Sequence, residues 1–564
     1  MVSENYSDLQ ARITANRIQS IELAHKLINP KLAYLYPPSN LKHMDIAVER
    51  LVNALQKKEI IGIETDHDCD GQTSHAIIYE ALTKGFGHPK ERTKSYIGHR
   101  MQEGYGLSHS LASRILEDNP KPSLIITADN GSSDEKQIAL LKLNGIDTIV
   151  TDHHTIPADG PPKSAYAVLN PSQENCDYGD KLIAGCMVAW LFMAQTRSKL
   201  QQMGWKHLPD MKQLLDFVAV GTIADCVSMA ESINNRAVTK AGLSIIKQSQ
   251  RICWHALQQR QDKPVNSEYL GFTVGPLLNS DGRLSDAFSS VSFLLEENGV
   301  EAEKWIQYLT EQNETRKAIQ KKLTEKAVLQ ANELVSKDYK SLCIYIDDGH
   351  AGIHGISASR IKDKFGRPTI IFSPKLNEAG IISGSARSLD NLNIKHILDM
   401  INQQHPDLMI KYGGHAGAAG LSIDYRNLKM FRSLFEQETS ANINGIALGP
   451  TIYTDGKLDA NDIKPCTIDE INQLEPFGRG FEYPLFEIEG EILSIKLVGK
   501  DKNHAQIFLE LENGKRIKGI WFNCDESIHE ITLNQAASVI GSIFISEYNG
   551  NEYININIRH IMPS

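Results

Sequence analysis

The chain has few of the features that mark membrane, secreted or metal–thiolate proteins. Its 564 residues include eight cysteines (69, 176, 186, 226, 253, 343, 466 and 524), and none of them forms a Cys-x-x-Cys pair. That absence argues against zinc ribbons and iron–sulfur clusters and fits a reducing cytoplasm. The longest apolar stretch, near 185–194, is too short to span a bilayer. The N-terminus also lacks the basic and apolar pattern of a signal peptide.

The chain also lacks an excess of basic residues. It has 59 Lys and Arg residues against 69 Asp and Glu residues, so its formal net charge is −10. Because nucleic-acid-binding proteins are often basic, any contacts with nucleic acid are expected to be local. The chain is 41% apolar and 23% charged, which is typical of a globular protein that can bury a sizeable core. Its length predicts three or four domains.

Carboxylates and imidazoles follow four apolar segments, where parallel strands would end. Ligands bind at the carboxyl ends of such strands. The segments with their polar residues are 60–64 before Asp66, Asp68 and Asp70, 124–127 before Asp129, 146–150 before Asp152, His153 and His154, and 217–224 before Asp225.

This arrangement predicts a metal site. Imidazole and carboxylate bind Mn²⁺, Zn²⁺ or Fe, and carboxylate binds Mg²⁺. Crowded carboxylates repel one another unless cations lie between them. We therefore expect two divalent metals, which would stabilise the attacking and leaving oxygens of a phosphoryl transfer to water. The alternative is capping aspartates and packed histidines, with Asp129-Asn130-Gly131 as a simple turn; we expect a turn that presents Asp129.

Three neighbours of these residues are interpreted as packing residues. In an extended segment alternate side chains point in opposite directions, so Asp66, Asp68 and Asp70 would face one way and Cys69 the other. Cys226, beside Asp225, is interpreted in the same way. His67 is expected to be a surface or packing residue.

The order Asp-x-Asp-x-Asp-Gly, Asp-Asn-Gly, Asp-His-His and Gly-Thr-x-Ala-Asp resembles the DHH phosphoesterase superfamily. Within it, the chain resembles the RecJ family of single-strand-specific DNA exonucleases, from about residue 45 to the C-terminus. Further matching segments begin at Arg100, Asn279, Gly355, Gly384, Gly413 and Leu474.

The resemblance implies roles for the acidic and histidine residues. Asp68 and Asp129 would hold one metal, and Asp70, Asp129, His153 and Asp225 the second, with Mn²⁺ or Mg²⁺ as the two ions. Asp66 and Asp152 would support these ligands, and His154 would face the scissile phosphate. Residues expected to bind DNA phosphates are Arg100, Arg283, Arg360, Ser385, Arg387, Gly413, Gly414 and His415.

The activity implied by the resemblance is 5′-to-3′ exonuclease hydrolysis of single-stranded DNA. The products would be 5′-mononucleotides, and the process DNA repair and recombination. Implied partners are single-stranded DNA, a single-strand-binding protein and a RecQ-type helicase. The protein is expected to be a monomer in the cytoplasm, with no membrane contact.

The predicted fold class is α/β, with two lobes that have mainly parallel sheets, a long connecting helix and a C-terminal β-barrel of the OB-fold type. The apolar spacing of three or four residues in 300–338 predicts the connecting helix. Short alternating strands after about 447 predict the barrel, with Phe508, Trp521, Phe522 and Tyr548 as base-stacking candidates or core residues. The expected domains are an N-terminal cap at 1–45, a catalytic domain at 46–299, the helix at 300–338, a substrate-binding domain at 339–446 and the barrel at 447–564.

Two segments depart from the family pattern. Residues 279–282 (Asn-Ser-Asp-Gly) have a serine and an acid where alanines are usual, and residues 477–481 (Phe-Gly-Arg-Gly-Phe) lack the usual Gly-Asn-Pro. Neither contains a proposed ligand, so the expected effect is on DNA handling. Deletion from about 447 onward is expected to weaken binding of long strands more than it slows cleavage.

Three alternative functions are weighed against the exonuclease. The first is a phosphodiesterase for cyclic dinucleotides or very short RNA, or a pyrophosphatase; the C-terminal barrel argues against it. The second is a non-catalytic replication scaffold, which is disfavoured because every ligand position is filled. The third is a single-strand-binding protein that uses the barrel alone, and this would leave the metal motifs without a purpose.

Overall fold

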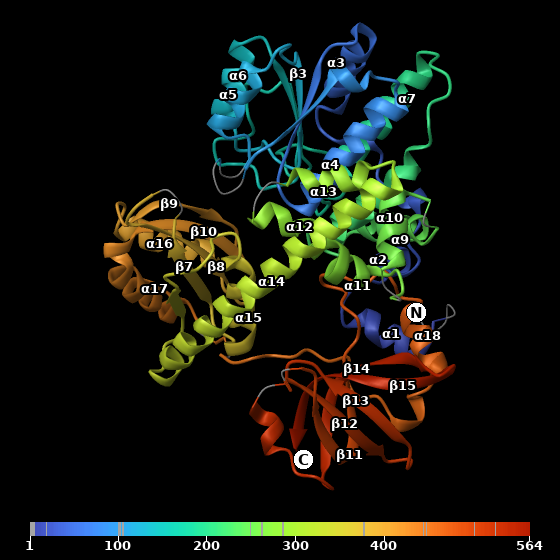
Figure 1. Ribbon diagram of the computed structural model, residues 1–564, viewed down its shortest axis with the longest axis vertical. Helices are drawn as coiled ribbons and strands as arrows, with labels where there is room; N and C mark the ends of the chain where they lie inside the picture. The colour runs from blue at the N-terminus through green and yellow to red at the C-terminus, as the bar shows by residue number, and fades with distance from the viewer. Residues whose placement is uncertain are drawn as a thin grey trace.

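The molecule consists of two α/β lobes and a C-terminal barrel, with a long helix between the lobes (Figure 1). The computed structural model describes residues 6–18, 20–99, 103, 106–248, 250–260, 263–284, 287–375, 378–443, 445–446, 448–500, 502–524 and 526–563. The catalytic lobe, at the top of the view, carries the acidic segments.

A five-stranded parallel sheet forms the centre of the catalytic lobe, in the order β2-β1-β3-β4-β5. Thr65 pairs with both Ile97 and Ala128, so the carboxyl ends of three strands are level. This places the segments after β1, β3 and β4 at one edge, as predicted. The strands are β1 Ile61–Thr65, β2 Thr93–Ile97, β3 Leu124–Ala128, β4 Asp147–Thr151 and β5 Ala167–Leu169.

Helices cover this sheet and continue into a helical layer that packs against it. Helices α5 and α6 lie on either side of β3 in the chain. The N-terminal segment contributes two short helices. The bounds are α1 Asp8–Ala15, α2 Ile21–Ile28, α3 Met44–Lys57, α4 Cys69–Glu80, α5 His109–Glu117, α6 Glu135–Leu143, α7 Gly185–Gln202, α9 Ile233–Lys247, α10 Ile252–Gln259, α11 Ser267–Tyr269, α12 Gly275–Leu284 and α13 Phe288–Leu295.

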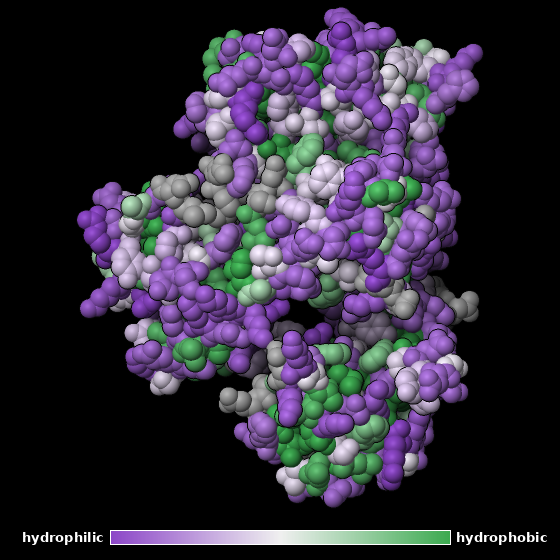
Figure 2. Space-filling view, viewed as in Figure 1, coloured by the Kyte–Doolittle hydropathy of each residue, from purple (hydrophilic) through white to green (hydrophobic). Residues whose placement is uncertain are grey.

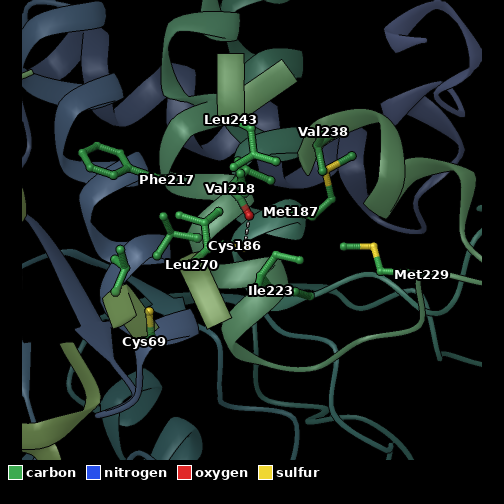
Figure 3. Close-up of a cluster of buried hydrophobic side chains, with 14 of the residues drawn as sticks. Cys69, Cys186, Met187, Phe217, Val218, Ile223, Met229, Val238, Leu243 and Leu270 are labelled. Atoms are coloured by element: carbon green, nitrogen blue, oxygen red, sulfur yellow. Dashed lines mark hydrogen bonds between the residues drawn. The ribbon is translucent and has the colours of Figure 1, made fainter. Parts of the chain in front are cut away.

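The segment before Asp225 is a helix, so the strand predicted at 217–224 is wrong. Helix α8 spans Leu215–Ala224, and residues Leu215–Ile223 are all buried. Figure 3 shows Phe217, Val218 and Ile223 of α8 packed among Cys69 of α4 and Met187 of α7. A helix enclosed on every side has no polar stripe, so periodicity does not separate it from a buried strand.

The long connecting helix is confirmed as α14, Gly299–Ser336. Its buried positions recur every three or four residues, which gives one apolar stripe along an otherwise charged helix. It packs against α12 in the catalytic lobe and against α15 in the second lobe. The buried residues are Ala302, Ile306, Leu309, Asn313, Arg316, Gln320, Leu323, Ala327 and Ala331.

The second lobe has a mixed sheet in the order β6-β7-β8-β10-β9, so the expectation of a mainly parallel sheet is wrong here. Within this sheet only β6 and β7 pair in parallel, whereas β8 directly follows β7 and β10 directly follows β9 as antiparallel neighbours, and β8 pairs antiparallel with β10. The elements are β6 Leu342–Tyr345, α15 His354–Phe365, β7 Thr369–Pro374, β8 Ile381–Arg387, α16 Ile394–Gln404, β9 Met409–Gly414, β10 Ala418–Asp424 and α17 Leu428–Asn442.

The C-terminal strands close into a five-stranded barrel in the order β11-β12-β13-β15-β14, which confirms the predicted barrel. Helix α18, Pro465–Asn472, lies at its end beside α1 (Figure 1). Trp521 belongs to the barrel core at 4% exposure, whereas Phe508, Phe522 and Tyr548 are exposed. The strands are β11 Phe486–Val498, β12 His504–Leu511, β13 Arg516–Trp521, β14 Ala536–Tyr548 and β15 Asn551–Pro563.

The surface in Figure 2 is mostly hydrophilic over the two lobes, while apolar side chains gather over the barrel. Within the described residues, no helix has both the length and the apolar character that a bilayer crossing requires. All eight cysteines are free thiols. Cys69 is buried, as expected, but Cys226 is exposed and does not belong to the core.

Candidate metal centre

The first acidic residues lie where β1 passes into α4. Asp68 is the N-cap of α4, and its Oδ1 accepts hydrogen bonds from the backbone N–H groups of Asp70 (3.0 Å) and Gly71 (3.2 Å). Asp70 therefore belongs to the first helical turn, and the fully extended segment predicted for residues 66–70 is wrong. The helix still directs Asp68 and Asp70 towards the same edge of the sheet as the ends of β3 and β4.

Asp70 is buried and is held by the start of α7. Its carboxylate accepts hydrogen bonds from the N–H groups of Gly185 (2.6 Å) and Cys186 (2.9 Å). N–H groups in the first turn of a helix have no acceptor within the helix, so they favour an anion such as this carboxylate. Burial raises the pKa of Asp70, and the charge of Asp68 adds to this effect, while the imidazole of His153 opposes it.

Asp129 occupies the centre of the cluster. Its φ of +67° is a left-handed conformation that few residues other than glycine, asparagine and aspartate adopt. The turn after β3 therefore does present Asp129, as predicted. A Cβ on Gly185 would lie 2.3 Å from Asp129 Oδ1, so glycine is required there. Burial and the charges of Asp70, Asp68 and Asp225 raise the pKa of Asp129 well above its usual range.

His153 joins the carboxylates from three elements. Its Nε2 lies 3.3 Å from Asp129 Oδ1, 3.5 Å from Asp225 Oδ2 and 3.8 Å from Asp70 Oδ2. Burial lowers the pKa of His153, which favours the neutral imidazole that binds metals. Asp225 reaches this point from the C-terminal end of α8.

Asp152 and His154 form a hydrogen-bonded pair beside the cluster. Asp152 Oδ1 lies 2.7 Å from His154 Nδ1 and also accepts the N–H groups of His153 and His154. Burial disfavours the imidazolium, but the hydrogen bond to Asp152 raises the pKa of His154 to about 10. The bond to Asp152 therefore favours the imidazolium form of His154. Asp152 is fixed in turn by the N–H of Ser132 at 3.0 Å.

The donor set fits divalent cations. Asp129 Oδ1 and His153 Nε2 are buried and have no hydrogen-bond partner among the described residues. Three groups of residues could each hold a cation, because the donor atoms within each group lie within 4.8 Å of one another. A cation would relieve the mutual repulsion that, together with burial, raises the pKa values of Asp70, Asp129 and Asp225. The groups are Asp129, His153 and His154; Asp70, His153 and Asp225; and Asp66, Asp68 and Asp129.

Asn279 and Gly282 of α12 position the start of α4. Asn279 Oδ1 accepts the N–H of Cys69 at 2.8 Å. A Cβ on Gly282 would lie 2.2 Å from the carbonyl oxygen of His67, so only glycine permits this approach. Asp281, the unusual acid of this segment, is buried and accepts hydrogen bonds from Ser289 Oγ and Tyr308 Oη. The departure from the family pattern is thus accommodated inside the lobe.

Arg387 is fixed in the second lobe beside the start of α15. Its Nη1 donates to Ser385 Oγ (3.0 Å) and to the carbonyl oxygen of Ala386 (2.8 Å). A Cβ on Gly355 would lie 2.4 Å from Arg387 Nη2, so this glycine makes room for the guanidinium. Loss of hydration lowers the pKa of His415, and the charges of Arg479, Arg387 and His154 lower it further.

The other predicted phosphate-binding residues have different settings. Arg283 Nη1 donates to the carbonyl oxygen of Gly352 (3.2 Å), a contact between the two lobes. Arg360 is exposed on α15. Gly413 and Gly414 end β9, and Gly414 has φ of +144°, which favours glycine. Arg100 lies outside the described residues.

The segment 474–481 docks on the catalytic lobe, which the sequence did not indicate. Arg236 of α9 is fully buried, and its guanidinium donates to the carbonyl oxygens of Leu474 (2.6 Å), Pro476 (2.8 Å) and Leu27. It also stacks on Phe481, 4.3 Å from the ring centroid. A deletion from 447 would therefore remove residues that pack on the catalytic lobe as well as the barrel. We therefore no longer expect this deletion to weaken binding of long strands more than it slows cleavage.

Comparisons with known proteins agree with this architecture. Three family models match: the N-terminal domain of the DHH family at residues 60–222, the DHHA1 domain at 338–441 and the RecJ OB domain at 454–560. The chain is 34% identical over 551 residues to a single-stranded-DNA-specific exonuclease RecJ of Haemophilus influenzae, covering 95% of this chain and 94% of that protein. It is 32% identical to the Escherichia coli protein of the same name, covering 94% and 92%.

Solved structures show the same fold. The RecJ of Thermus thermophilus in complex with Mn²⁺ matches with a TM-score of 0.80 and 24% identity, over 100% of this chain and 77% of that chain. An exonuclease RecJ bound to manganese matches with a TM-score of 0.59 and 27% identity, over 72% and 97%. With its DHH, DHHA1 and OB segments in this order and relatives above 30% identity along nearly its whole length, the chain belongs to the RecJ family of the DHH superfamily.

Proposed function

We propose that the protein is a metal-dependent exonuclease that hydrolyses single-stranded DNA from the 5′ end and releases 5′-mononucleotides. The observation that carries the proposal is the cluster of carboxylates and imidazoles at the edge of the catalytic sheet, in which each group of three donor residues has ligand atoms within 4.8 Å of one another. Arg387, Gly413, Gly414 and His415 of the second lobe are the proposed phosphate-binding residues. The relatives named single-stranded-DNA-specific exonuclease support the substrate class.

The proposed metal ligands all belong to the three donor groups of the cluster. Asp68 and Asp129 would hold one Mn²⁺ or Mg²⁺, and Asp70, Asp129, His153 and Asp225 the other. When bound, two such ions supply positive charge for the attacking and leaving oxygens of the phosphodiester. Asp66 and Asp152 would support the ligands from behind. The neighbouring solved structures with Mn²⁺ and Mg²⁺ support this choice of ions.

His154 is the protein's own cation at the reacting phosphate. Because Asp152 raises the pKa of His154 to about 10, the imidazolium persists over the physiological pH range. A fixed positive donor beside the scissile phosphate stabilises the negative charge that develops there. Asp152 also orients the ring through the hydrogen bond at Nδ1.

The 5′ terminus would bind in the second lobe. A 5′-phosphate carries more negative charge than an internal phosphodiester, and a guanidinium with backbone N–H groups favours it. Arg387 is already held by Ser385 and packed against Gly355 at the start of α15, so little side-chain freedom is lost on binding. A terminus anchored there would set the distance to the metal ions and give one-nucleotide steps.

Degradation of end-labelled strands tests the proposed function. Single-stranded DNA incubated with Mn²⁺ or Mg²⁺ should release mononucleotides, and chelator should stop the reaction. A block at the 5′ end should stop degradation, whereas a block at the 3′ end should not. The opposite pattern would refute the polarity, and release from a cyclic dinucleotide but not from a long strand would favour the alternative phosphodiesterase. The RecJ OB segment at 454–560 argues against that alternative.

Substituting Arg387→Ala should impair cleavage of 5′-phosphorylated strands by about 10- to 100-fold, the value of a charge-assisted hydrogen bond. Cleavage of 5′-hydroxyl strands should fall less, because the lost contact is to the terminal phosphate. The measurement is kcat/KM for a matched pair of strands with either terminus. Arg426→Ala, an exposed arginine paired with Asp424, is the control. An equal loss on both strands would contradict a terminal role for Arg387.

The barrel is proposed to extend the binding site for longer strands. Phe508, Phe522 and Tyr548 remain exposed and are candidates for base stacking, whereas the buried Trp521 is excluded. Binding to a single-strand-binding protein and a RecQ-type helicase, a monomeric state, a cytoplasmic location and a role in DNA repair and recombination stay predictions. The division into domains at 45/46, 299/300, 338/339 and 446/447 is likewise a proposal.

A further inference from the structure

Arg479 lies at the tip of a rigid turn in the docked segment 474–481. Gly478 and Phe481 exchange two backbone hydrogen bonds, of 3.0 and 2.9 Å, which leaves Arg479 and Gly480 as the two central residues. Gly480 has φ of +77°, as a glycine at the third position of a type II turn does. The backbone that carries Arg479 is therefore fixed.

The same turn rests on the segment that follows the proposed ligand Asp225. The N–H of Met229 donates to the carbonyl oxygen of Arg479 at 2.8 Å. A Cβ on Gly478 would lie 2.8 Å from Met229 Cγ, and one on Gly480 would lie 3.2 Å from Ala230 Cβ. This close packing fixes Arg479 against the stretch that leads away from the acidic cluster.

The Arg479 side chain is exposed, and within the described residues no hydrogen bond or ion pair occupies its guanidinium. Its charge acts with those of Arg387 and His154 on His415 at the edge of the site. Cations from three separate segments thus act on one residue beside the acidic cluster.

We propose that Arg479 binds a backbone phosphate of the single strand next to the scissile bond. The inference rests on the proposed function, because the anion is taken to be DNA. The cluster itself carries several carboxylates, which repel a polyanion that approaches it. A guanidinium held at its edge, free of an internal partner, would attract the strand and place one phosphate. The unusual arginine in the Phe-Gly-Arg-Gly-Phe segment then has a function in DNA handling.

The test measures binding without hydrolysis, in an Asp129→Asn background. Affinity for a labelled strand of four nucleotides is followed by anisotropy over a range of salt concentrations. Arg479→Gln should weaken binding about 10-fold and reduce the slope of log Kd against log salt by about 0.7, the value of one phosphate contact on a single strand. Arg479→Lys should keep most of the slope, and Arg426→Gln, whose side chain is exposed and paired with Asp424, should change neither quantity.

The outcomes separate the inference from the proposed function. An unchanged affinity and slope in Arg479→Gln would overturn the inference, and so would a change seen only with strands of 30 nucleotides, since that would place the contact far from the metal centre. Equal thermal melting of wild type and Arg479→Gln is expected, because the carbonyl that bonds to Met229 remains. A wild-type protein that binds the short strand through Arg479 but hydrolyses no DNA would refute the proposed function alone.

Discussion

Hydrolysis of single-stranded DNA should fall by about 1,000-fold or more when Asp129 is replaced by asparagine. Asp129 is shared between two of the three donor groups and is the proposed bridge between the metals, so its loss removes charge stabilisation from both oxygens of the reaction. Asparagine is the informative substitution, since it accepts the left-handed conformation of this residue, φ +67°, whereas alanine would strain the turn. Initial rates with Mn²⁺ and Mg²⁺ measure the effect.

The same variant should be at least as stable as the wild type when no metal is bound. Burial and neighbouring charges raise the pKa of the Asp129 carboxyl, so its ionised form is penalised in the folded state. The metal-free wild type should therefore lose stability as pH rises above about 4, the pKa of an unfolded aspartate. Asp129→Asn should lose less, and Mn²⁺ should raise the melting temperature of the wild type far more than that of the variant.

A matched control is Asp159→Asn, a change of the same kind at an exposed position outside the cluster. It should leave hydrolysis, the pH dependence and the Mn²⁺ effect on melting unchanged. A folded Asp129→Asn protein with nearly wild-type hydrolysis would refute the two-metal assignment. A variant that still melts higher with Mn²⁺ by the wild-type margin would show that the ions bind elsewhere.

The acidic edge was predictable because it depends on local patterns. Short apolar runs followed by polar residues predicted β1, β3 and β4, and the parallel register then brings their ends level. The same logic failed at 217–224, because a helix buried on all sides shows no periodicity. It also failed for the geometry of Asp70, which is held by N–H groups of Gly185 and Cys186, more than 100 residues away.

The mixed sheet of the second lobe was mispredicted for a related reason. Alternation of strands with helices favours parallel pairing, and β6 with β7 follows it. Strands β8 and β10 instead directly follow β7 and β9 as antiparallel neighbours, and the Gly-rich segment that begins at Gly413 forms the end of β9 and the turn into β10. A stretch rich in glycine and small residues gives little strand signal, although it forms the edge that carries His415.

The role of Arg236 could not be predicted from the sequence because its hydrogen-bond partners are backbone atoms. Its three acceptors are the carbonyl oxygens of residues 209, 240 and 238 positions away, and carbonyl oxygens have no residue signature. The contact nevertheless joins the N-terminal helices, the catalytic lobe and the segment 474–481. A large effect on stability is therefore expected at this residue.

Replacing Arg236 with leucine should lower the free energy of unfolding by about 3–5 kcal/mol. The substitution leaves the buried carbonyl oxygens of Leu27, Leu474 and Pro476 without a donor and removes the stacking on Phe481. Arg236→Lys should recover only part of the loss, since one ammonium cannot span the positions that a guanidinium fork reaches. Urea denaturation measures the effect, with Lys240→Leu on the exposed side of the same helix as the control.

Hydrolysis separates a local role from a global one. At temperatures where Arg236→Leu is still folded, the segment 474–481 should detach from the stretch after Asp225. Without the bonds from Arg236, the carbonyl oxygen of Arg479 is no longer held in place to accept the N–H of Met229. Protease cleavage within 474–481 should then speed up before global unfolding, and the rate of DNA hydrolysis should fall along with it. If the segment 474–481 stays equally protected from protease, or if the free energy of unfolding falls by less than about 1 kcal/mol, Arg236 is not what holds this segment on the catalytic lobe.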